Sequence, residues 1–334
     1  MRRCRDTEGV SFSFGRAEPG TVGVEEELFF VDAETLRAAP GFSQVVGEAD
    51  EHVKPEVFES LVELATPVLP DATSVLRDLT RRRSEISDRA AGHGLRVYAA
   101  GSHPYASGRD QAIVPVPRYR KMVESLGDVM LQQLVCGLHV HVSMADPDAA
   151  LSAFERVVPW LPVLLALSAN SPYAEGADTG RRSERAQRLL LLPTGGTPPV
   201  LRGWDDWKAA PDRHFDAWPR PEYGTLEVRV LDMQTDVRRS AGFAAIVRAL
   251  VSAATGTADE PYDRELYARR REETSRLPPD PAEVAALAAL VESALGAEER
   301  ELARLVLEGR PEAERQLDVG IAEAARDVTE RTLR

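Results

Sequence analysis

The chain has 334 residues, of which 43% are hydrophobic and 28% charged, proportions that are ordinary for a soluble globular protein. Its formal net charge is −13, and an acidic chain is a poor general binder of nucleic acid or of anionic membrane surfaces. The two cysteines, Cys4 and Cys136, are too few for a disulfide framework, and no apolar stretch follows the basic N-terminus as it would in a signal peptide. We therefore expect a cytoplasmic, soluble protein.

The first part of the chain predicts strands separated by one helix. Alternating apolar residues indicate a strand at Thr21–Val31, and a second extended stretch covers Phe58–Val68. Asp71 is a typical N-cap for the helix that follows, and Gly92 is placed to end it. A further strand is expected at Leu95–Gly101.

The middle of the chain predicts a helix, a strand and then a strongly apolar helical region. The helix is expected at Tyr119–Val135 and the strand at Cys136–Met144. Asp146, followed by proline, is a typical helix start. The longest apolar run, Val157–Ala169, contains two prolines that should break the helix, and the run alone is too short to span a bilayer.

The last part of the chain predicts an irregular region, one strand and a layer of helices. Gly176–Asp212 is rich in Gly, Pro and Arg and is expected to be a long functional loop. Tyr223–Asp232 alternates as a strand, and helical spacing dominates from Ser240 onward, with a break at Pro278–Pro281. Because the strands do not recur in a regular βαβ order, we expect an α+β fold with a mostly antiparallel sheet.

Two of the predicted strands carry functional groups on one face and apolar residues on the other. Alternate residues of a strand share a face, so Glu25 and Glu27 project together, as do His139 and His141. The first pair indicates either a Mg²⁺ site or a solvated strand edge. The second indicates either a metal site or two histidines hydrogen-bonded in a polar cavity, with a structural role slightly favoured for His141.

Two other segments extend this pattern. Thr225, Glu227 and Arg229 share a strand face, where Glu and Arg could form a salt bridge or a metal ligand beside a phosphate clamp. Further carboxylates that could bind metal are Glu56, Glu59 and Glu63. A site with so many acids needs several divalent cations, and Mg²⁺ with arginines is typical of sites that handle nucleoside triphosphates. No Walker-type loop or GxGxxG sequence is present, so metal is expected to hold the phosphates.

A series of motifs, in order, resembles the glutamate–cysteine ligase type 2 (carboxylate–amine ligase) family. The motifs are GVEEELFFVD (Gly23–Asp32), ELATPV (Glu63–Val68), AAGSHPY (Ala99–Tyr105), CGLHVHVS (Cys136–Ser143), LPVLLALSANSP (Leu161–Pro172), DTGRRSER (Asp178–Arg185) and YGTLEVRVLD (Tyr223–Asp232). The resemblance implies a glutamine-synthetase-like fold, in which a curved, mostly antiparallel sheet forms a funnel flanked by helices. We expect one catalytic domain over residues 1–334, with a polar leader (1–20), a ligase core (21–254) and a helical C-terminal part (255–334).

The resemblance also implies chemistry, in which ATP phosphorylates a carboxylate and an amine displaces the phosphate. By match to the family, and for Glu56 to the wider ligase superfamily, the implied Mg²⁺ ligands are Glu25, Glu27, Glu56, Glu63, His139 and Glu227. Arg229 is expected to contact the transferred phosphoryl group beside Glu227, and Arg185 is a candidate second phosphate contact. The family also suggests a homo-oligomer.

One departure from the family bears on the substrates. The family's D-x-R-P-x-P segment is Asp216–Pro221 here, so Trp218 stands where an arginine is usual and Arg220 is a candidate to reach the same space. Three alternatives therefore remain beside glutamate–cysteine ligation: a ligase for another carboxylate or amine, a metal-dependent hydrolase, and a nucleotide-binding relative without catalysis.

Overall fold

A seven-stranded sheet forms the centre of the computed structural model, which describes residues 12–210, 214–253 and 262–333. The N-terminal basic segment and Cys4 lie outside the described residues. All strand pairs of this sheet are antiparallel, which confirms the predicted α+β class. In spatial order the strands are β10 (Ala217–Arg220), β11 (Thr225–Asp232), β5 (Gly137–Ser143), β1 (Val22–Asp32), β3 (Leu61–Ala65) and β2 (Val53–Pro55), with β4 (Leu95–Tyr98) also pairing with β1.

Strand β1 is the structural centre of the sheet because three strands pair with it. Its Glu25–Phe29 segment pairs with β3 along one edge. The other edge pairs first with β5, over residues 22–26, and then with β4, over residues 29–32. The remaining described strands are short pairs away from this sheet: β6 (Tyr173–Ala174) with β7 (Ala177–Asp178), and β8 (Gly195–Gly196) with β9 (His214–Phe215).

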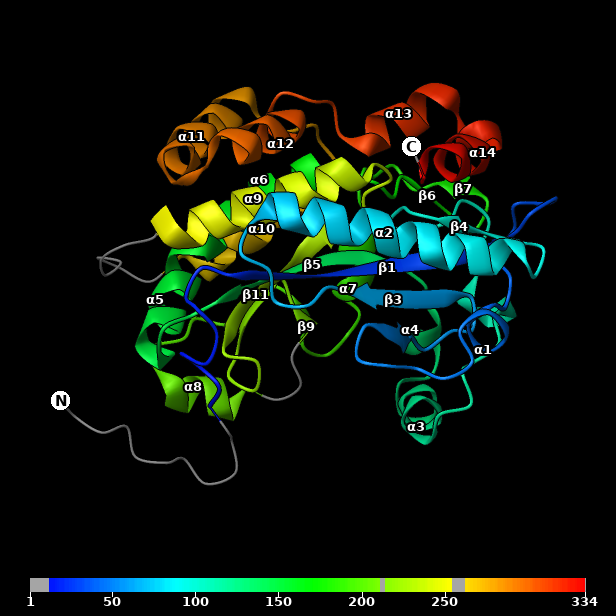
Figure 1. Ribbon diagram of the computed structural model, residues 1–334, viewed down its shortest axis with the longest axis horizontal. Coiled ribbons are helices and arrows are strands. Elements are labelled where there is room, and N and C mark those ends of the chain that lie inside the picture. The colour runs from blue at the N-terminus through cyan, green and yellow to red at the C-terminus, as the bar shows by residue number, and fades with distance from the viewer. Residues whose placement is uncertain (1–11, 211–213, 254–261, 334) are drawn as a thin grey trace.

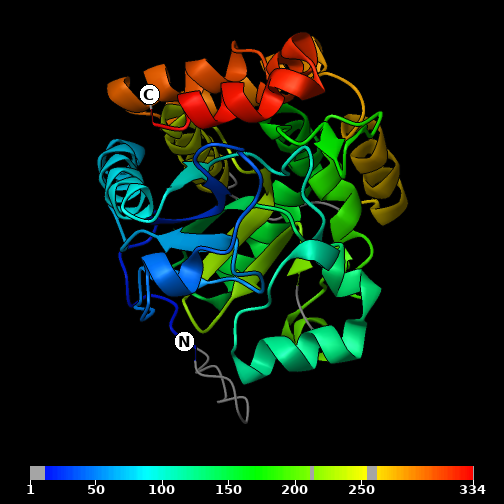
Figure 2. The same cartoon turned by 90° about the vertical axis from the view of Figure 1, so that its right-hand side faces the viewer.

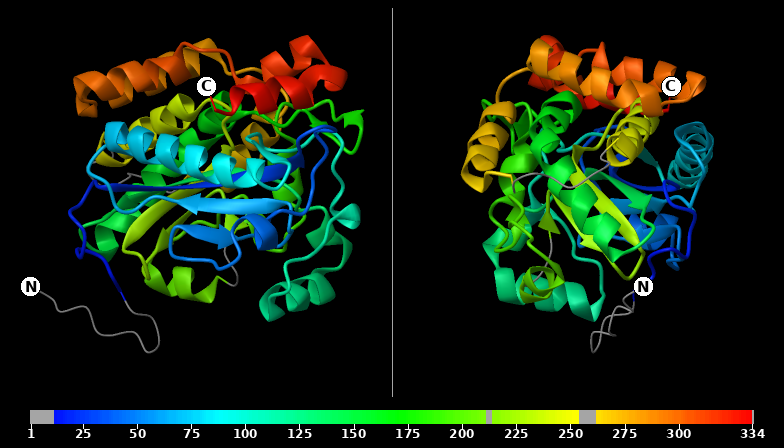
Figure 3. Two further views of the ribbon diagram at one scale, coloured as in Figure 1. Left: turned by 45° about the vertical axis from the view of Figure 1, so that its right-hand side comes forward. Right: turned by 90° about the vertical axis from the view of Figure 1, so that its left-hand side faces the viewer.

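Helices cover the sheet in layers. Helices α2 and α9 pack on the face of β1 that carries Val22 and Val24, and α11 to α14 form a further layer beyond them (Figure 1). Helix α3 lies at the opposite end of the molecule from this outer layer, as the turned views also show (Figures 2 and 3). The helices are α1 (Phe42–Val45), α2 (Ala72–Ala91), α3 (Pro117–Leu126), α4 (Asp128–Leu131), α5 (Pro147–Val157), α6 (Leu161–Ser168), α7 (Glu184–Leu189), α8 (Trp204–Ala209), α9 (Val237–Ala253), α10 (Arg264–Thr274), α11 (Pro281–Val291), α12 (Ala297–Leu307), α13 (Glu312–Val319) and α14 (Ile321–Arg331).

The capping residues identified in the sequence start the helices that they were expected to start. The Asp71 side chain accepts a hydrogen bond from Ser74 N at the start of α2, and Asp146 accepts one from Ala149 N at the start of α5. All five predicted strands are present, with ends that differ from the predicted ones by up to three residues. Strand β2 was not predicted, because three residues are too few to show alternation.

The expected break in the helix around residue 160 is present as a short 3₁₀ turn, Val158–Trp160, that separates α5 from α6 without an intervening loop. Two predicted elements differ from the structure. The expected helix Tyr119–Val135 is divided into α3 and α4 at Gly127, whose φ of 54° ends the first helix. The expected loop Gly176–Asp212 contains α7 and α8, both too short to give a clear periodic pattern.

The continuous helical stretch Pro147–Ser168 alone, among the described residues, is long and apolar enough to cross a membrane by length and composition. The apolar run Val157–Ala169 is too short by itself, and α5 supplies the additional length. In the most apolar window of the stretch 67% of the residues are buried, a share that is typical of a core helix. Every residue of α6 is buried, so this helix packs inside the protein.

A buried ion pair joins β1 to the helical layers. Glu26 points away from Glu25 and Glu27, toward α2, and its carboxylate accepts hydrogen bonds from Arg83 Nε at 2.7 Å and Nη2 at 2.6 Å. Arg83 also donates to the backbone carbonyls of Gln234 and Thr235, in the connection between β11 and α9. Both charged side chains are almost fully buried. Their mutual contact therefore fixes which face of β1 turns toward the helices.

We predict that Glu26→Gln destabilises the fold strongly. The substitution leaves the buried Arg83 guanidinium without a compensating charge, and breaking such a pair costs about 3–5 kcal/mol. The free energy of unfolding in urea measures this loss. The matched control is Glu85→Gln, which removes the exposed pair with Arg81 and should cost less than about 1 kcal/mol. Equal, small losses in both variants would contradict the prediction.

Candidate functional site

The face of β1 opposite Glu26 brings acidic and imidazole side chains together. Glu27 stands directly opposite Glu63 on β3, and Glu25 stands directly opposite His139 on β5. Directly opposite residues of antiparallel strands place their side chains on the same face, about 5 Å apart. The strand register thus assembles a row of ionisable groups from segments far apart in the sequence.

A first group of three carboxylates lies at one end of this row. One carboxylate oxygen from each of Glu27, Glu56 and Glu63 lies within 4.8 Å of the others. Burial and the neighbouring Glu27 and Glu63 raise the pKa of Glu56 well above its ordinary value. Burial and Glu25 also raise the pKa of Glu63, against the effect of Lys54, whose Nζ lies 2.8 Å from Glu63 Oε1. We call these three residues the acidic triad.

A second group combines two carboxylates with a histidine. Ligand atoms of Glu25, His141 and Glu227 also lie within 4.8 Å of one another. His141 Nδ1 lies 3.0 Å from Thr225 Oγ1, while its Nε2 lies 3.7 Å from Glu25 and 3.9 Å from Glu227. Within the described residues this buried Nε2 has no hydrogen-bond partner. We call these three residues the mixed triad.

Charges in the mixed triad keep its carboxylates ionised. Although burial acts in the opposite direction, the hydrogen bond with His139 and the nearby imidazole of His141 lower the pKa of Glu25. Burial by itself would raise the pKa of Glu227, but the positive charges of Arg229 and Arg220 outweigh this effect and lower that pKa. The sequence reasoning slightly favoured a structural role for His141, because alternation alone could not tell which histidine faces two carboxylates.

His139 lies between the two triads. Its Nδ1 is 3.2 Å from Glu25 Oε2, and its Nε2 is 3.7 Å from Glu27 Oε1. The side chain is almost fully buried. The predicted ligand therefore contacts a carboxylate of each triad, and the whole predicted set of metal ligands lies in one place.

Arg229 enters the site from an irregular part of β11. The pairing of β11 with β5 shifts register between Val228 and Leu231, and Arg229 Nε lies 3.1 Å from Glu227 Oε1. The backbone N–H groups of Arg229 and Val230 both donate to the carbonyl oxygen of Asp216, at 2.8 and 3.0 Å. This bulge keeps Arg229 beside Glu227 although strict alternation is broken.

Arg185 holds the other side of the same bulge. Its Nη2 donates to the Arg229 carbonyl at 3.1 Å and lies 3.4 Å from His139 Nε2. The side chain is 1% exposed, and its Nε has no hydrogen-bond partner among the described residues. Gly137 makes room for it, since a Cβ at that position would lie 2.2 Å from Arg185 Nη2.

Asp216 is a structural part of the site that the sequence reasoning missed. Its fully buried carboxylate accepts hydrogen bonds from Arg271 Nε at 2.6 Å, Arg271 Nη2 at 3.0 Å and the Tyr267 hydroxyl at 2.6 Å. Helix α10 thereby fixes the residue whose carbonyl holds the bulge. No local signal pointed to Arg271, which lies in a run of three arginines more than fifty residues from Asp216.

The departure at Trp218 leaves the charged site intact. Trp218 is buried among aromatic rings, with Phe215 at 5.0 Å and Trp207 at 6.2 Å between centroids. Arg220, two residues later on β10, forms an ion pair with Glu227. This contact places Arg220 at the charged site, and its correspondence to the usual arginine stays a prediction.

Three other residues of the predicted strands and sequence motifs lie outside the two triads. Glu59 accepts hydrogen bonds from the backbone N–H and hydroxyl of Ser43, so its expected place among the metal-binding carboxylates is wrong. Cys136 is buried, and burial raises the pKa of its thiol well above the ordinary value. His103 contacts the Leu36 carbonyl and the Tyr105 N–H, as a loop-shaping residue would.

Two cavities meet the row of ionisable groups. Cavity A, of about 440 Å³, is lined by the acidic triad together with Arg185, Arg229 and several apolar side chains. Cavity B, of about 510 Å³, is lined by Glu25 and His141 together with Arg16, Lys54 and Tyr223. The site can therefore receive molecules from two directions.

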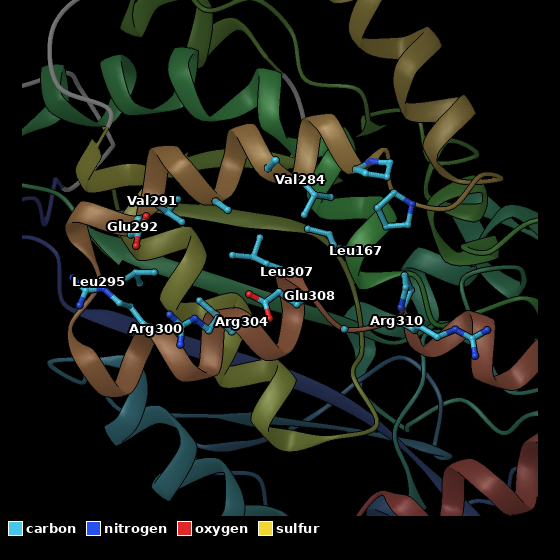
Figure 4. A pocket seen from close by; sticks show the side chains of 17 residues that line it. Leu167, Val284, Val291, Glu292, Leu295, Arg300, Arg304, Leu307, Glu308 and Arg310 are labelled. Carbon is cyan, nitrogen blue, oxygen red and sulfur yellow. The ribbon is translucent and has the colours of Figure 1, made fainter.

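A larger cavity of about 600 Å³ lies away from these groups. It is formed mainly by α11 and α12, where Val284, Val291 and Leu307 face one another and Arg300, Arg304 and Arg310 lie at the margins (Figure 4). Neither triad contributes to its lining. Volume alone therefore does not identify the functional site.

The donor atoms of the two triads suit hard divalent cations. Carboxylate oxygens are the ligands that Mg²⁺ prefers, and imidazole is compatible with several divalent metals. Crowded buried carboxylates repel one another, as the raised pKa of Glu56 indicates, and a cation would relieve that repulsion. His141 Nε2, which has no hydrogen-bond partner within the described residues, is a further nitrogen that could bind a cation here.

Comparison with known proteins identifies the family. The family model described as glutamate–cysteine ligase family 2 matches residues 21–277. A Rubrobacter xylanophilus protein is 34% identical over 80% of this chain and 76% of its own length, and a Roseiflexus castenholzii protein is 33% identical over 70% and 66%; both are named as putative glutamate–cysteine ligases 2.

Solved structures show the same fold at low sequence identity. The glutamate–cysteine ligase of Francisella tularensis, solved in complex with AMP, is 12% identical with a TM-score of 0.67, covering 95% of this chain and 89% of that one. A bifunctional glutathione synthetase from Pasteurella multocida is 14% identical with a TM-score of 0.62, covering 94% and 51%. With these motifs, this fold and a family match over most of its length, the chain belongs to glutamate–cysteine ligase family 2 and is a carboxylate–amine ligase.

Proposed function

We propose that the chain is an ATP- and Mg²⁺-dependent ligase that joins a carboxylate to an amine through an acyl phosphate. The observation that carries this proposal is the pair of adjacent triads with Arg229 beside them. Glutamate and cysteine are the first substrates to test, because the relatives and one structural neighbour are named for that reaction. A neighbour bound to AMP supports a nucleotide as the phosphoryl donor.

The proposed ligands of Mg²⁺ are the acidic triad, the mixed triad and His139. Bound Mg²⁺ would neutralise charge on the phosphates of ATP. Between them these residues supply five carboxylates and two imidazoles from β1, β3, β5, β11 and the residue after β2. The inclusion of His141 extends the ligand set expected from the sequence.

Arginines are proposed to act on the transferred group. Arg229 is placed to stabilise the negative charge of the migrating phosphoryl group, and Glu227 keeps the guanidinium oriented. Although burial acts in the opposite direction, Glu227 and Glu27 raise the pKa of Arg229, so the positive charge is retained. Arg185 is proposed as a second phosphate contact through its Nε, which has no hydrogen-bond partner in the part of the chain that the structure describes.

The proposed reaction has two steps. A carboxylate oxygen of the substrate attacks the γ-phosphorus of ATP, the bond to the bridging oxygen breaks, and ADP leaves. The amine nitrogen then attacks the acyl carbon, the C–O bond to phosphate breaks, and the amine proton is released to phosphate or solvent. An acyl phosphate is reactive, so the second step needs positioning of the amine more than a strong base.

We predict that Glu27→Gln and Glu227→Gln each reduce activity roughly 10²-fold or more, because each removes a charged ligand from one triad. Phosphate release from ATP is measured with Mg²⁺, glutamate and cysteine, and the shift of the thermal midpoint by Mg²⁺ gives a second readout that needs no turnover. Glu85→Gln, on the exposed side of α2, serves as the control. Undiminished activity in both Glu27→Gln and Glu227→Gln would contradict the assignment of these residues as metal ligands.

The same assay separates the competing functions. A metal-dependent hydrolase would turn over a substrate with metal but without ATP. A nucleotide-binding relative without catalysis would bind ATP with Mg²⁺ and release no phosphate. The ligase proposal requires phosphate release that depends on ATP, a carboxylate and an amine together.

We also predict that Gly137→Ala lowers kcat roughly 10²-fold while the protein stays folded. The new Cβ would meet Arg185 Nη2 at 2.2 Å and His139 Nε2 at 2.8 Å, so both side chains must move. A displacement of about 1 Å in a catalytic group can cost a factor of this size. Gly203→Ala is the matched control, because its Cβ would meet nothing within 4 Å and its φ of 170° suits any residue. Equal activity of the two variants would contradict a role for this packing.

A further inference from the structure

The lining of cavity A combines a small charged group with many apolar side chains. The charged group is the acidic triad with Arg185 and Arg229. The aliphatic and thioether side chains include Leu61, Met122, Leu126, Met130, Leu189 and Leu192. A mostly apolar site with a few polar groups selects ligands with the same composition.

The positively charged side chains of cavity A are already engaged. Among the described residues that line it, Arg185 and Arg229 are the only lysine or arginine side chains. Arg185 already donates to two backbone carbonyls, and Arg229 is paired with Glu227. A ligand nitrogen with an uncharged, apolar remainder fits these surroundings better than a ligand with a free carboxylate.

Gln133 offers a hydrogen-bond acceptor at the same cavity. Its Nε2 donates to the carbonyls of Val129 at 3.1 Å and Arg188 at 2.9 Å, which fixes the orientation of the amide. Its Oε1 has no hydrogen-bond partner among the described residues, and the side chain is 8% exposed. Buried acceptors without donors are unfavourable, so a ligand N–H would be preferred here.

Cavity B has the features that suit the nucleotide instead. Tyr223 is 63% exposed, and its ring lies edge-on to His141 with 5.9 Å between centroids. Its lining also holds Arg16 and Lys54 against Glu25, Glu51 and Glu222, and Glu25 and His141 belong to the mixed triad. An exposed aromatic ring on which a base can stack, beside two of the proposed Mg²⁺ ligands, suits a nucleotide and leaves cavity A for another substrate.

We infer that cavity A binds the amine substrate and that this amine carries an apolar side chain, with Gln133 Oε1 accepting a hydrogen bond from the amine or from a neighbouring N–H. The inference rests on the proposed ligase function and names the class of its acceptor. The amine nitrogen forms a bond to the acyl carbon. The bond between that carbon and the phosphate oxygen breaks, and phosphate leaves. The surplus amine proton goes to phosphate or solvent.

The first experiment separates this inference from the proposed function. Hydroxylamine is small enough to need no side-chain cavity and converts an acyl phosphate to a hydroxamate. The full-length protein is incubated with ATP, Mg²⁺, hydroxylamine and a panel of carboxylates that begins with glutamate. Hydroxamate formation supports the acyl phosphate and identifies the carboxylate. Its absence with every carboxylate would overturn the proposed function and this inference with it.

The second experiment measures the amine preference with the carboxylate so identified. Butylamine and 3-aminopropan-1-ol have equal numbers of heavy atoms and differ in one terminal group, and cysteine serves as reference. We expect kcat/KM for butylamine to exceed that for the amino alcohol at least about tenfold, with 2-phenylethylamine also accepted. Hydroxamate formation combined with equal kcat/KM values would overturn this inference and leave the ligase function standing.

Variants of two neighbouring glutamines test the place of binding. Gln133→Met keeps the shape of the side chain but removes the acceptor, so we expect KM for butylamine to rise about tenfold. Gln132→Met is the matched control, because Gln132 does not line the cavity and donates to the Asp128 carbonyl near the surface. If Gln133→Met raises KM for ATP and leaves KM for butylamine unchanged, the nucleotide binds in cavity A and the assignment is overturned.

Discussion

The main constraint on the site is the electrostatic repulsion among carboxylates that the antiparallel strand register places close together. Glu25 and Glu27 share a face of β1, and the pairing of β1 with β3 and β5 adds Glu63 and His139 at the opposite positions. Such a row is unfavourable unless positive charge compensates it. Lys54, Arg220 and Arg229 supply part of that charge, and the remaining donor atoms suit divalent cations.

The opposite face of β1 supplies the rigidity that this arrangement requires. Glu26 and Arg83 bind one another in the interior and connect β1 to α2 and to the segment after β11. On the other side of the site, Asp216 and Arg271 fix the bulge that carries Arg229. Two buried ion pairs, whose residues line neither cavity A nor cavity B, thus determine where the reactive face lies and how Arg229 projects from it.

Much of this could be predicted from the sequence because strand alternation is a local property. It correctly placed Glu25 with Glu27, and Glu227 with Arg229, on one strand face. Register is not local, so the proximity of His141 to Glu227 and the contact of Glu59 with Ser43 could not be foreseen. The bulge at Arg229 and the support from Arg271 also depend on tertiary contacts, as does the turn to α4 at Gly127. The motifs of the family supplied the ATP chemistry, which alternation alone left open between a salt bridge and a metal site.

The most direct test of the account is the number of divalent cations that the chain binds. Mn²⁺ replaces Mg²⁺ at oxygen-rich sites and can be counted by electron paramagnetic resonance during titration with a non-hydrolysable ATP analogue present. Because the two triads are separate groups of ligands, the account predicts at least two bound Mn²⁺ per chain, and a lower number in Glu63→Gln. The absence of bound Mn²⁺, or an equal number in the Glu63→Gln variant, would contradict it.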